Sequence, residues 1–207
     1  MVKRIADITG SLLLLGLLLP VMAVTALVIL IGMGRPVVFR QYRLSCRGVP
    51  FVLYKFRTMR EQYSSDCSPL PDAVRVTTIG RFLRATSIDE LPQLVNVLKG
   101  EMSMVGPRPL LPSHQELYTP VQARRQEVRP GITGWAQVNG RNSVSWERKL
   151  DLDVWYVDHR SWWLDCRILL LTLVKVLARE GISQSKESTA RLLADGTPPS
   201  RNPGGKE

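Results

Sequence analysis

The sequence predicts a mostly helical α+β membrane protein, and three features of the chain predict it. An uncharged apolar stretch from Ser11 to Gly34 is long enough to cross a bilayer as a helix. Residues 37–56 alternate enough around a turn signal to form a small β-hairpin or two short strands. Several segments between residues 78 and 179 have apolar residues at helical spacing.

The apolar stretch is expected to stay on the mature protein, because it is too long for a signal-peptide core and no clean cleavage site follows it. Pro20 in its middle removes one helical hydrogen bond and predicts a kink. Basic residues flank both ends of the stretch: Lys3, Arg4, Arg35, Arg40, Arg43 and Arg47. Since positive charge favours the cytoplasmic side, a bent helix that enters and leaves by one face fits, and a simple transmembrane anchor is the alternative.

Composition limits the remaining possibilities. The length of 207 residues allows one globular domain beside the membrane segment. The net charge of +10 implies an anionic partner, for which nucleic acid, anionic lipid and phosphorylated substrate are candidates. The three cysteines lack paired spacing, so neither a disulfide framework nor a zinc site is expected.

The first part of the globular domain is expected to hold the hairpin, a loop and two helices. The hairpin turn is predicted at residues 47–50, and the polar, proline-containing residues 61–72 predict a loop. Apolar and basic residues at helical spacing predict a helix from Thr78, and residues 91–98 predict a second helix that Gly100 ends.

Prolines and glycines divide the second part of the globular domain into loops and helices. Residues 102–112 contain three prolines and a glycine and are expected to be irregular, and residues 129–141 are expected to form a second loop. Helices are predicted over residues 113–127 and 145–156. Residues 162–179 predict a helix lying in the membrane interface, with a buried core helix as the alternative.

Two adjacent carboxylates, Asp89 and Glu90, lie at a predicted helix start. Ser87 and Glu90 match the S-x-x-E capping pattern, and capping is the favoured interpretation of these residues taken alone. Pro92 fits best in the first turn, which would put both carboxylates at the positive end of the helix. The free N–H groups of such a turn also bind phosphate, so a nucleophile and a phosphate would meet there.

Arginines surround this pair in the sequence. Arg84 precedes it, on the helix predicted from Thr78, and Arg108 stands in the rigid proline loop. As a structural turn that loop has no further role, whereas as a phosphate clamp it would use the planar guanidinium group. Arg40 and Arg43 are expected on a solvated basic face near anionic headgroups.

Six motifs in order resemble the bacterial sugar transferase family, the small monotopic phosphoglycosyl transferases: KRIAD, YKFRTM, RATSIDELPQL, GEMSMVGPRP, RPGITGWAQVNGR and DVWYVDHRSWWLD. The resemblance runs from about Lys3 to Gly181. It implies an enzyme that moves a sugar 1-phosphate from a UDP-sugar to polyprenyl (undecaprenyl) phosphate, releases UMP and initiates surface glycan assembly.

The resemblance also implies roles for individual residues. Asp89 matches the nucleophile that forms a covalent aspartyl phosphosugar, and Glu90 matches its partner as proton acceptor or orienting group. Mg²⁺ is the implied cofactor, with Asp89 in contact with the metal. The positions that match substrate- or phosphate-binding residues are Arg108, Arg84, Lys55, Arg57, Arg141 and Asp153. One-step transfer without a covalent intermediate and a non-catalytic, membrane-tethered anion-binding module are the alternatives.

The implied organisation is a re-entrant membrane helix over residues 1–36, a cytoplasmic catalytic domain with interfacial helices over residues 37–183, and a disordered tail over residues 184–207. Leu19 stands before Pro20, where the family usually has a serine. The implied location is the cytoplasmic face of a bacterial inner membrane. The expected partners are a UDP-sugar, polyprenyl phosphate and membrane lipids, with no nucleic acid, while the sugar and the oligomeric state stay open.

Overall fold

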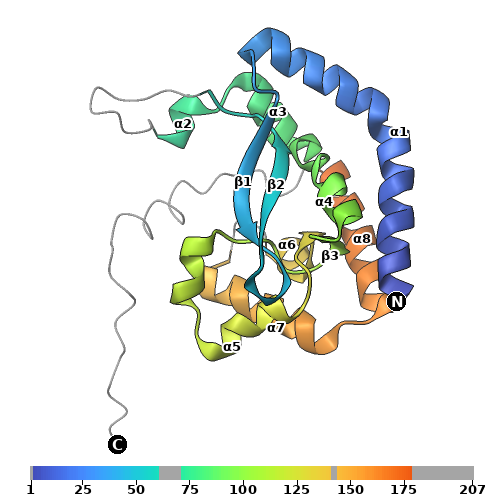
Figure 1. Cartoon of the computed structure of the whole chain (residues 1–207), viewed down its shortest axis with the longest axis vertical. Coiled ribbons are helices and arrows are strands. Elements are labelled where there is room, and N and C mark those ends of the chain that lie inside the picture. The colour runs from blue at the N-terminus through green and yellow to red at the C-terminus, as the bar shows by residue number, and fades with distance from the viewer. Residues whose placement is uncertain (1, 61–70, 141–143, 179–207) are drawn as a thin grey trace, which may run out of the picture.

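The computed structural model describes residues 2–60, 71–140 and 144–178, and it contains helices around two small sheets (Figure 1). In chain order, with η marking 3₁₀ helices, the elements are α1 (Val2–Met33), β1 (Val38–Leu44), η1 (Cys46–Gly48), β2 (Pro50–Phe56), α2 (Asp72–Arg75), α3 (Thr78–Ala85), η2 (Ile88–Glu90), α4 (Gln93–Lys99), β3 (Ser103–Val105), η3 (Pro112–Leu117), α5 (Pro120–Ala123), η4 (Arg124–Glu127), β4 (Gly131–Thr133), α6 (Trp135–Asn139), α7 (Trp146–His159) and α8 (Trp162–Leu177). The predicted mostly helical fold with a small hairpin is confirmed.

Helix α1 is a bent 32-residue helix that lies along the outside of the other elements (Figure 1). It contains Pro20, and proline weakens the hydrogen-bond ladder and favours a bend. Its exposure pattern is the reverse of that of a soluble helix: its buried residues include Asp7, Ser11 and Thr25, while most of its leucines and valines are exposed. By length and composition α1 is able to cross a membrane, and only 11% of its most apolar window is buried against the protein.

Both ends of α1 contact the same globular body. Near the N-terminus, the Asp7 Oδ1 atom accepts hydrogen bonds from the Ser103 hydroxyl (3.0 Å) and the Met104 N–H (2.9 Å). Near the C-terminus, Ile29 is fully buried in a cluster with Phe56 and Leu83. The two halves of α1 are therefore both fixed to one structural unit.

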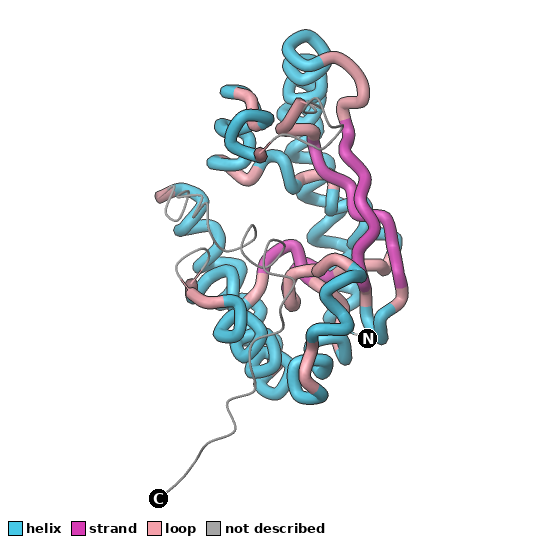
Figure 2. Tube along the Cα trace, turned by 90° about the vertical axis from the view of Figure 1, so that its left-hand side faces the viewer, coloured by secondary structure: helices cyan, strands magenta, loops and turns pink. Residues whose placement is uncertain are grey.

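Strands β1 and β2 form the predicted antiparallel hairpin, with Val38 opposite Phe56 and Leu44 opposite Pro50. The hairpin lies along one side of the helical body (Figure 2). Asn96, fully buried on α4, joins this hairpin to the helices: its side chain accepts from the Tyr54 N–H (3.1 Å) and donates to the Val52 carbonyl (2.7 Å). This contact fixes α4, and the turn before it, against β2.

The prediction that residues 102–112 are irregular throughout is wrong at their start. Ser103–Val105 form β3, which pairs in parallel with β4, because the residues that break a strand begin only at Gly106. The residues after Gly106 are irregular, as expected. Gly131 allows the close approach of the two strands, since a Cβ atom there would lie 2.1 Å from the Gly106 nitrogen.

The single helix predicted over residues 113–127 is also wrong. The chain forms η3, α5 and η4 instead, because Pro120 lacks an N–H and starts a new helix, capped by Thr119. Residues 129–141 are more regular than the predicted loop, since β4 and α6 lie within them.

The other helices follow the sequence closely. Helices α3 and α7 begin after their N-caps Thr77 and Ser145, and α4 ends at Gly100, whose φ of 87° is left-handed. Helix α8 forms where predicted and keeps Leu169, Leu170, Leu173 and Val174 exposed. It is therefore not a buried core helix. The predicted tail over residues 184–207 and most of the loop over residues 61–72 lie outside the described residues.

Candidate active site

Asp89 and Glu90 lie in the 3₁₀ turn η2, between α3 and α4. The capping interpretation of these residues is wrong, because the Ser87 side chain makes no cap hydrogen bond. Ser87 has a left-handed φ of 57°, so the turn reverses sharply before the two carboxylates. The turn directs the two carboxylates differently: Asp89 is 8% exposed, and Glu90 reaches the basic residues described next.

Glu90 is held by two cations from different parts of the chain. Its Oε1 atom lies 2.9 Å from the Lys55 Nζ atom, on β2, and 2.7 Å from the Arg108 Nη2 atom, in the proline loop. Burial opposes ionisation of Glu90, but the charges and hydrogen bonds of Arg108 and Lys55 outweigh it and hold the pKa of this carboxyl well below its usual range. Glu90 is therefore a permanent anion that positions both cations.

Asp89 is in the opposite electrostatic state. Burial, and then the negative charge of Glu90, raise the pKa of Asp89 from 3.8 to about 6, although Lys55, Arg108 and Arg84 counteract part of this shift. With a pKa of about 6 the carboxylate is mostly ionised at pH 7, and its burial removes most of its solvation. Such a carboxylate is more nucleophilic than a solvated one.

Arg84 and Arg57, two of the predicted phosphate-binding residues, differ in their contacts. The Arg84 Nε atom donates to the buried Thr58 hydroxyl (3.0 Å), and Gly80 allows this approach because a Cβ atom there would lie 1.9 Å from the Thr58 carbonyl oxygen. The Arg57 guanidinium donates to the carbonyls of Met59 (3.1 Å) and Arg35 (2.9 Å). Arg57 thus joins the end of β2 to the segment after α1.

Asp153 does not face the carboxylate pair directly. Its Oδ2 atom accepts from the Nε (3.1 Å) and Nη2 (2.7 Å) atoms of Arg125, and both side chains are buried. Arg125 in turn donates to the Arg108 carbonyl oxygen (2.6 Å). The other Asp153 oxygen, Oδ1, is buried without a hydrogen-bond partner among the described residues. Asp153 therefore reaches the site through the Arg125 and Arg108 pair, and it offers one free acceptor.

A metal at this site would depend on few protein ligands. Within residues 2–60, 71–140 and 144–178, no group of three or more His, Cys, Asp or Glu side chains is arranged to hold a metal ion. Mg²⁺ is commonly bound by one or two carboxylates together with substrate phosphates and water. Since Glu90 is occupied by two cations, Asp89 is the carboxylate of this pair that fits such a site.

Comparison with known proteins identifies the group to which this site belongs. The family model for bacterial sugar transferases matches residues 1–179. The chain belongs to the bacterial sugar transferase family. The sugar transferase EpsL of Bacillus subtilis (strain 168) is 55% identical over 188 residues, which cover 91% of this chain and 93% of that protein.

The chain is also similar to parts of two longer proteins whose names state the sugar that they transfer. The UDP-glucose:undecaprenyl-phosphate glucose-1-phosphate transferase of Escherichia coli (strain K12) is 40% identical over 185 residues, covering 84% of this chain and 40% of that protein. The galactosyl transferase CpsE of Streptococcus agalactiae is 43% identical over 194 residues, covering 86% of this chain and 43% of that protein. This transferase thus spans less than half the length of these two relatives.

Sequence reasoning missed two residues near the transferase site. Arg125 is 5% exposed and fixes the Arg108 loop, but one arginine in a basic run gave no signal of burial. Lys149 on α7 is half-buried, and burial followed by the charge of Arg108 lowers its pKa. Of the predicted residues, the structure brings together Lys55, Arg84, Asp89, Glu90 and Arg108, while Arg141 lies outside the described residues.

Proposed function

We propose that this transferase moves a sugar 1-phosphate from a UDP-sugar to polyprenyl phosphate through a covalent intermediate on Asp89. The proposal rests on the different environments of the two carboxylates. Asp89 is buried and has a raised pKa, while Glu90 holds Lys55 and Arg108 beside it. The name of the E. coli relative, which states transfer of glucose 1-phosphate from UDP-glucose to undecaprenyl phosphate, supports the same reaction class.

The proposed reaction has two displacements at one phosphorus atom. First, an Asp89 carboxylate oxygen attacks the β-phosphorus of the UDP-sugar, the bond to the bridging oxygen breaks, and UMP leaves. Next, an oxygen of polyprenyl phosphate attacks the same phosphorus, the bond to Asp89 breaks, and the carboxylate is regenerated. The product is a polyprenyl diphosphate sugar. Asp89 enters and leaves as an anion, so the two steps require no net proton transfer to the enzyme.

Around these steps, the basic residues stabilise negative charge. Glu90 places Lys55 and Arg108 beside Asp89, where both cations would stabilise the charge that develops on the phosphate oxygens. With its pKa well below the usual range, Glu90 is a weak base, which favours the orienting role over that of proton acceptor. Asp89 is the residue that would hold Mg²⁺, and the ion would supply positive charge for the leaving group.

We also propose that α1 is re-entrant and that the catalytic body lies on the cytoplasmic face of the membrane. Two contact sets support this arrangement: Lys3, Arg4 and Asp7 bind the body at one end of α1, and Ile29 packs into it at the other. A straight span would carry the first turn about 30 Å across the bilayer, away from these partners. In a variant whose three native cysteines are replaced by serine, single cysteines at Val2 and Arg35 should therefore react with an impermeant maleimide from the same side, and opposite-side labelling would reject re-entry.

Exchange of radiolabelled UMP into UDP-sugar tests the covalent route. Full-length protein in detergent is given magnesium and a panel of UDP-glucose, UDP-galactose and N-acetylated amino sugar donors, first without polyprenyl phosphate. Exchange with one donor that is lost in Asp89→Asn supports the two-step reaction and names the sugar. UMP release that strictly requires undecaprenyl phosphate, without exchange, indicates one-step transfer.

A second comparison separates catalysis from binding alone. Arg108→Ala should reduce UMP release strongly, because it removes a cation from the site of charge development. No release with any donor, from folded wild-type protein, would instead favour a non-catalytic anion-binding module. Such a module would bind UDP-sugar by charge, and its binding would weaken with salt and survive the Asp89→Asn substitution.

A further inference from the structure

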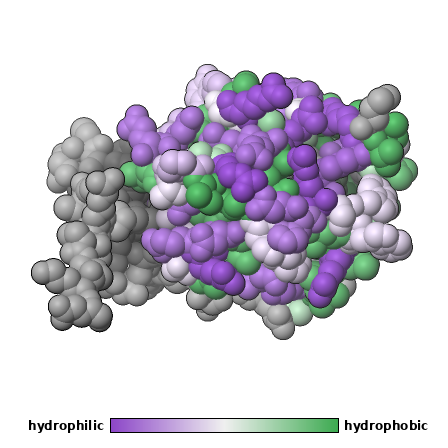
Figure 3. Space-filling model, turned by 90° about the horizontal axis from the view of Figure 1, so that it is seen from below, coloured by the Kyte–Doolittle hydropathy of each residue, from purple (hydrophilic) through white to green (hydrophobic). Residues whose placement is uncertain are grey.

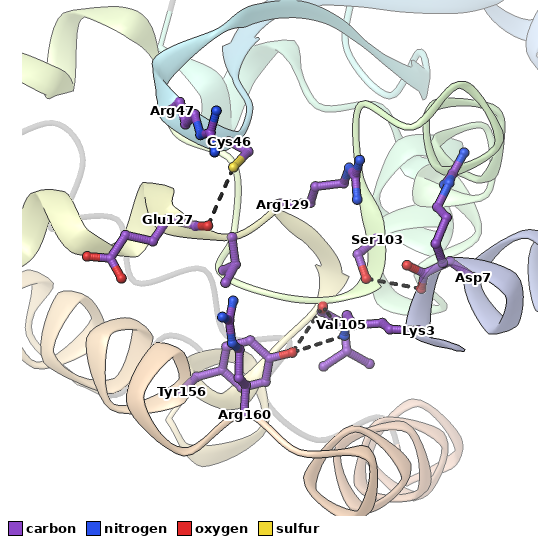
Figure 4. Close-up of a pocket in the computed structure, with 12 residues that line it drawn as sticks. Lys3, Asp7, Cys46, Arg47, Ser103, Val105, Glu127, Arg129, Tyr156 and Arg160 are labelled. Carbon is purple, nitrogen blue, oxygen red and sulfur yellow. Dashed lines mark hydrogen bonds between the residues drawn. The ribbon is translucent and has the colours of Figure 1, made fainter. Parts of the chain in front are cut away.

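A cavity of about 480 Å³ lies beneath the first turn of α1, between that turn, the hairpin turn at Cys46–Gly48 and the end of α7 (Figure 4). Its volume lies within the range of about 300–1,000 Å³ that is usual for small-molecule pockets. The lining of this cavity includes none of the residues of the proposed transfer site, which are Lys55, Arg84, Asp89, Glu90 and Arg108. The cavity is therefore distinct from the proposed transfer site.

Cationic side chains dominate the lining. They are Lys3, Arg4, Arg47, Arg129 and Arg160. Among the described residues, Arg47 and Arg160 have no hydrogen-bond or ion-pair partner, and Arg129 uses only its Nε atom, toward the Gly100 carbonyl (2.8 Å). In Figure 4 Arg47, Arg129 and Arg160 line the cavity from three segments: the hairpin turn, the residues before β4 and the end of α7. Three guanidinium groups are therefore available to a ligand.

The acidic residues of the lining do not neutralise these arginines. The Asp7 carboxylate is buried and accepts from Ser103 and Met104. The Glu127 carboxylate pairs with Arg124 (3.2 Å), and only its backbone carbonyl faces Cys46. The uncompensated charge of the cavity is therefore positive, which suits an anion.

The hairpin turn holds Arg47 in a conformation that disfavours an arginine. Its φ of 58° lies in the left-handed region, which costs a residue with a side chain roughly 1 kcal/mol and which glycine adopts freely. Binding of a ligand by the Arg47 guanidinium would explain why an arginine, and not a glycine, occupies this position. Charge and backbone conformation thus both point to a ligand for Arg47.

The surroundings of the cavity fit the headgroup level of a membrane. Val2 and Ile5 of the same α1 turn are exposed, and the exposed Trp162 and Trp163 follow Arg160 closely in the chain. Seen from below, the described surface is mainly hydrophilic, with apolar side chains interspersed among the hydrophilic ones (Figure 3). Tryptophans and arginines in this arrangement are typical of the layer that contains lipid phosphates.

We propose that this cavity binds a phosphate group, carried by an anionic phospholipid or by a soluble phosphodiester of the same headgroup chemistry, through Arg47, Arg129 and Arg160. The phosphate oxygens accept hydrogen bonds from the free guanidinium N–H groups. The volume leaves room for the glycerol part of such a headgroup. Occupation would hold the hairpin turn, α7 and the first turn of α1 together at the membrane surface.

Native mass spectrometry of the full-length protein in a neutral detergent tests the proposal. The probes are dihexanoyl phosphatidylglycerol, dihexanoyl phosphatidylcholine and glycerophosphoglycerol, which is the phosphatidylglycerol headgroup without acyl chains. The wild type should bind one phosphatidylglycerol in preference to phosphatidylcholine. Arg47→Gln/Arg160→Gln should bind it roughly 30-fold more weakly, on the basis of two lost cation contacts.

Two matched variants control for other effects. Arg148→Gln removes an exposed arginine from the other end of α7, and Arg108→Ala weakens the proposed transfer site; both should keep wild-type affinity. Near-ultraviolet circular dichroism checks that each variant is folded. Because binding is measured without transfer, failure of the proposed function would leave this result unaffected.

The probes also identify the source of the phosphate. Equal binding of glycerophosphoglycerol and phosphatidylglycerol supports a phosphate site that accepts a soluble phosphodiester. Binding of phosphatidylglycerol alone supports a phosphate site that requires a lipid. Unchanged affinity in the double variant, an equal loss in Arg148→Gln, or no binding of any probe by the wild type would overturn the proposal.

Discussion

The Arg125 Nη2 atom donates a hydrogen bond to the Arg108 carbonyl oxygen at 2.6 Å, so one arginine holds the backbone of another. Arg125 is itself fixed by its buried ion pair with Asp153. The side chain of Arg108 is thereby free to reach Glu90, while its backbone cannot move away from α7 and η4. The direction of the Arg108 guanidinium depends on a residue that does not touch the carboxylate pair.

We expect Arg125→Met to destabilise the protein by roughly 3–5 kcal/mol, because it leaves the Asp153 charge buried without a partner. Arg125→Met/Asp153→Leu should recover much of this stability, since both members of the pair are then apolar. Transfer activity should stay low in both variants, because neither holds the Arg108 loop. Thermal unfolding and UMP release measure the two effects, and full activity in the double variant would exclude the positioning role of Arg125.

Asp89→Asn should abolish transfer and stabilise the fold. The folded-state pKa of Asp89 is raised to about 6, so stability falls as the pH rises from about 4 to 6 and the buried carboxyl loses its proton. Above pH 7 the cost is about 2–3 kcal/mol, which the neutral asparagine avoids. We expect a higher Tm for Asp89→Asn at pH 7.5 and no difference near pH 3.5.

The exposed Asp151 on α7 provides the matched control. Asp151→Asn makes the same chemical change without removing a buried charge, so its Tm should follow that of the wild type at both pH values. If the difference in Tm between Asp89→Asn and the wild type is the same at pH 3.5 and pH 7.5, ionisation of Asp89 is not its cause.

The sequence predicted the elements with local signals and missed those made by distant contacts. The hairpin, α3, the end of α4, α7 and α8 have alternation, helical spacing or caps of their own. Strands β3 and β4 are only three residues each, and their pairing depends on contact between segments nearly thirty residues apart. Such pairing is not visible in local periodicity.

In the candidate site, too, the sequence identified residues within motifs but not the properties that depend on distant contacts. The motifs identified Asp89, Glu90, Lys55, Arg84 and Arg108, which the structure brings together. The opposite ionisation states of Asp89 and Glu90 were not predictable, because they depend on which carboxylate is buried and which one reaches two cations. The guanidinium of Arg57, which the resemblance assigns to phosphate, donates to two backbone carbonyls, and these contacts have no signal in the sequence.

The pH dependence of transfer should report Asp89. Because only the ionised carboxylate attacks phosphorus, kcat/KM should rise with pH and level off with an apparent pKa near 6. Glu90 should not contribute a limb in this range, since its pKa lies well below the usual value. Initial rates of UMP release between pH 5 and 8 measure the profile, and a flat profile would mean that Asp89 does not titrate there.

Glu90→Gln should move this profile and lower the rate at the same time. The Glu90 charge raises the pKa of Asp89, so its removal should shift the acidic limb to lower pH. The plateau should fall by roughly 10- to 1,000-fold, because Lys55 and Arg108 lose the anion that places them. Glu116→Gln, at an exposed glutamate in η3, should keep both the wild-type limb and the wild-type plateau. A lower plateau with an unmoved limb would show that Glu90 positions the cations without acting on Asp89, and a limb moved to higher pH would contradict the arrangement of charges at this site.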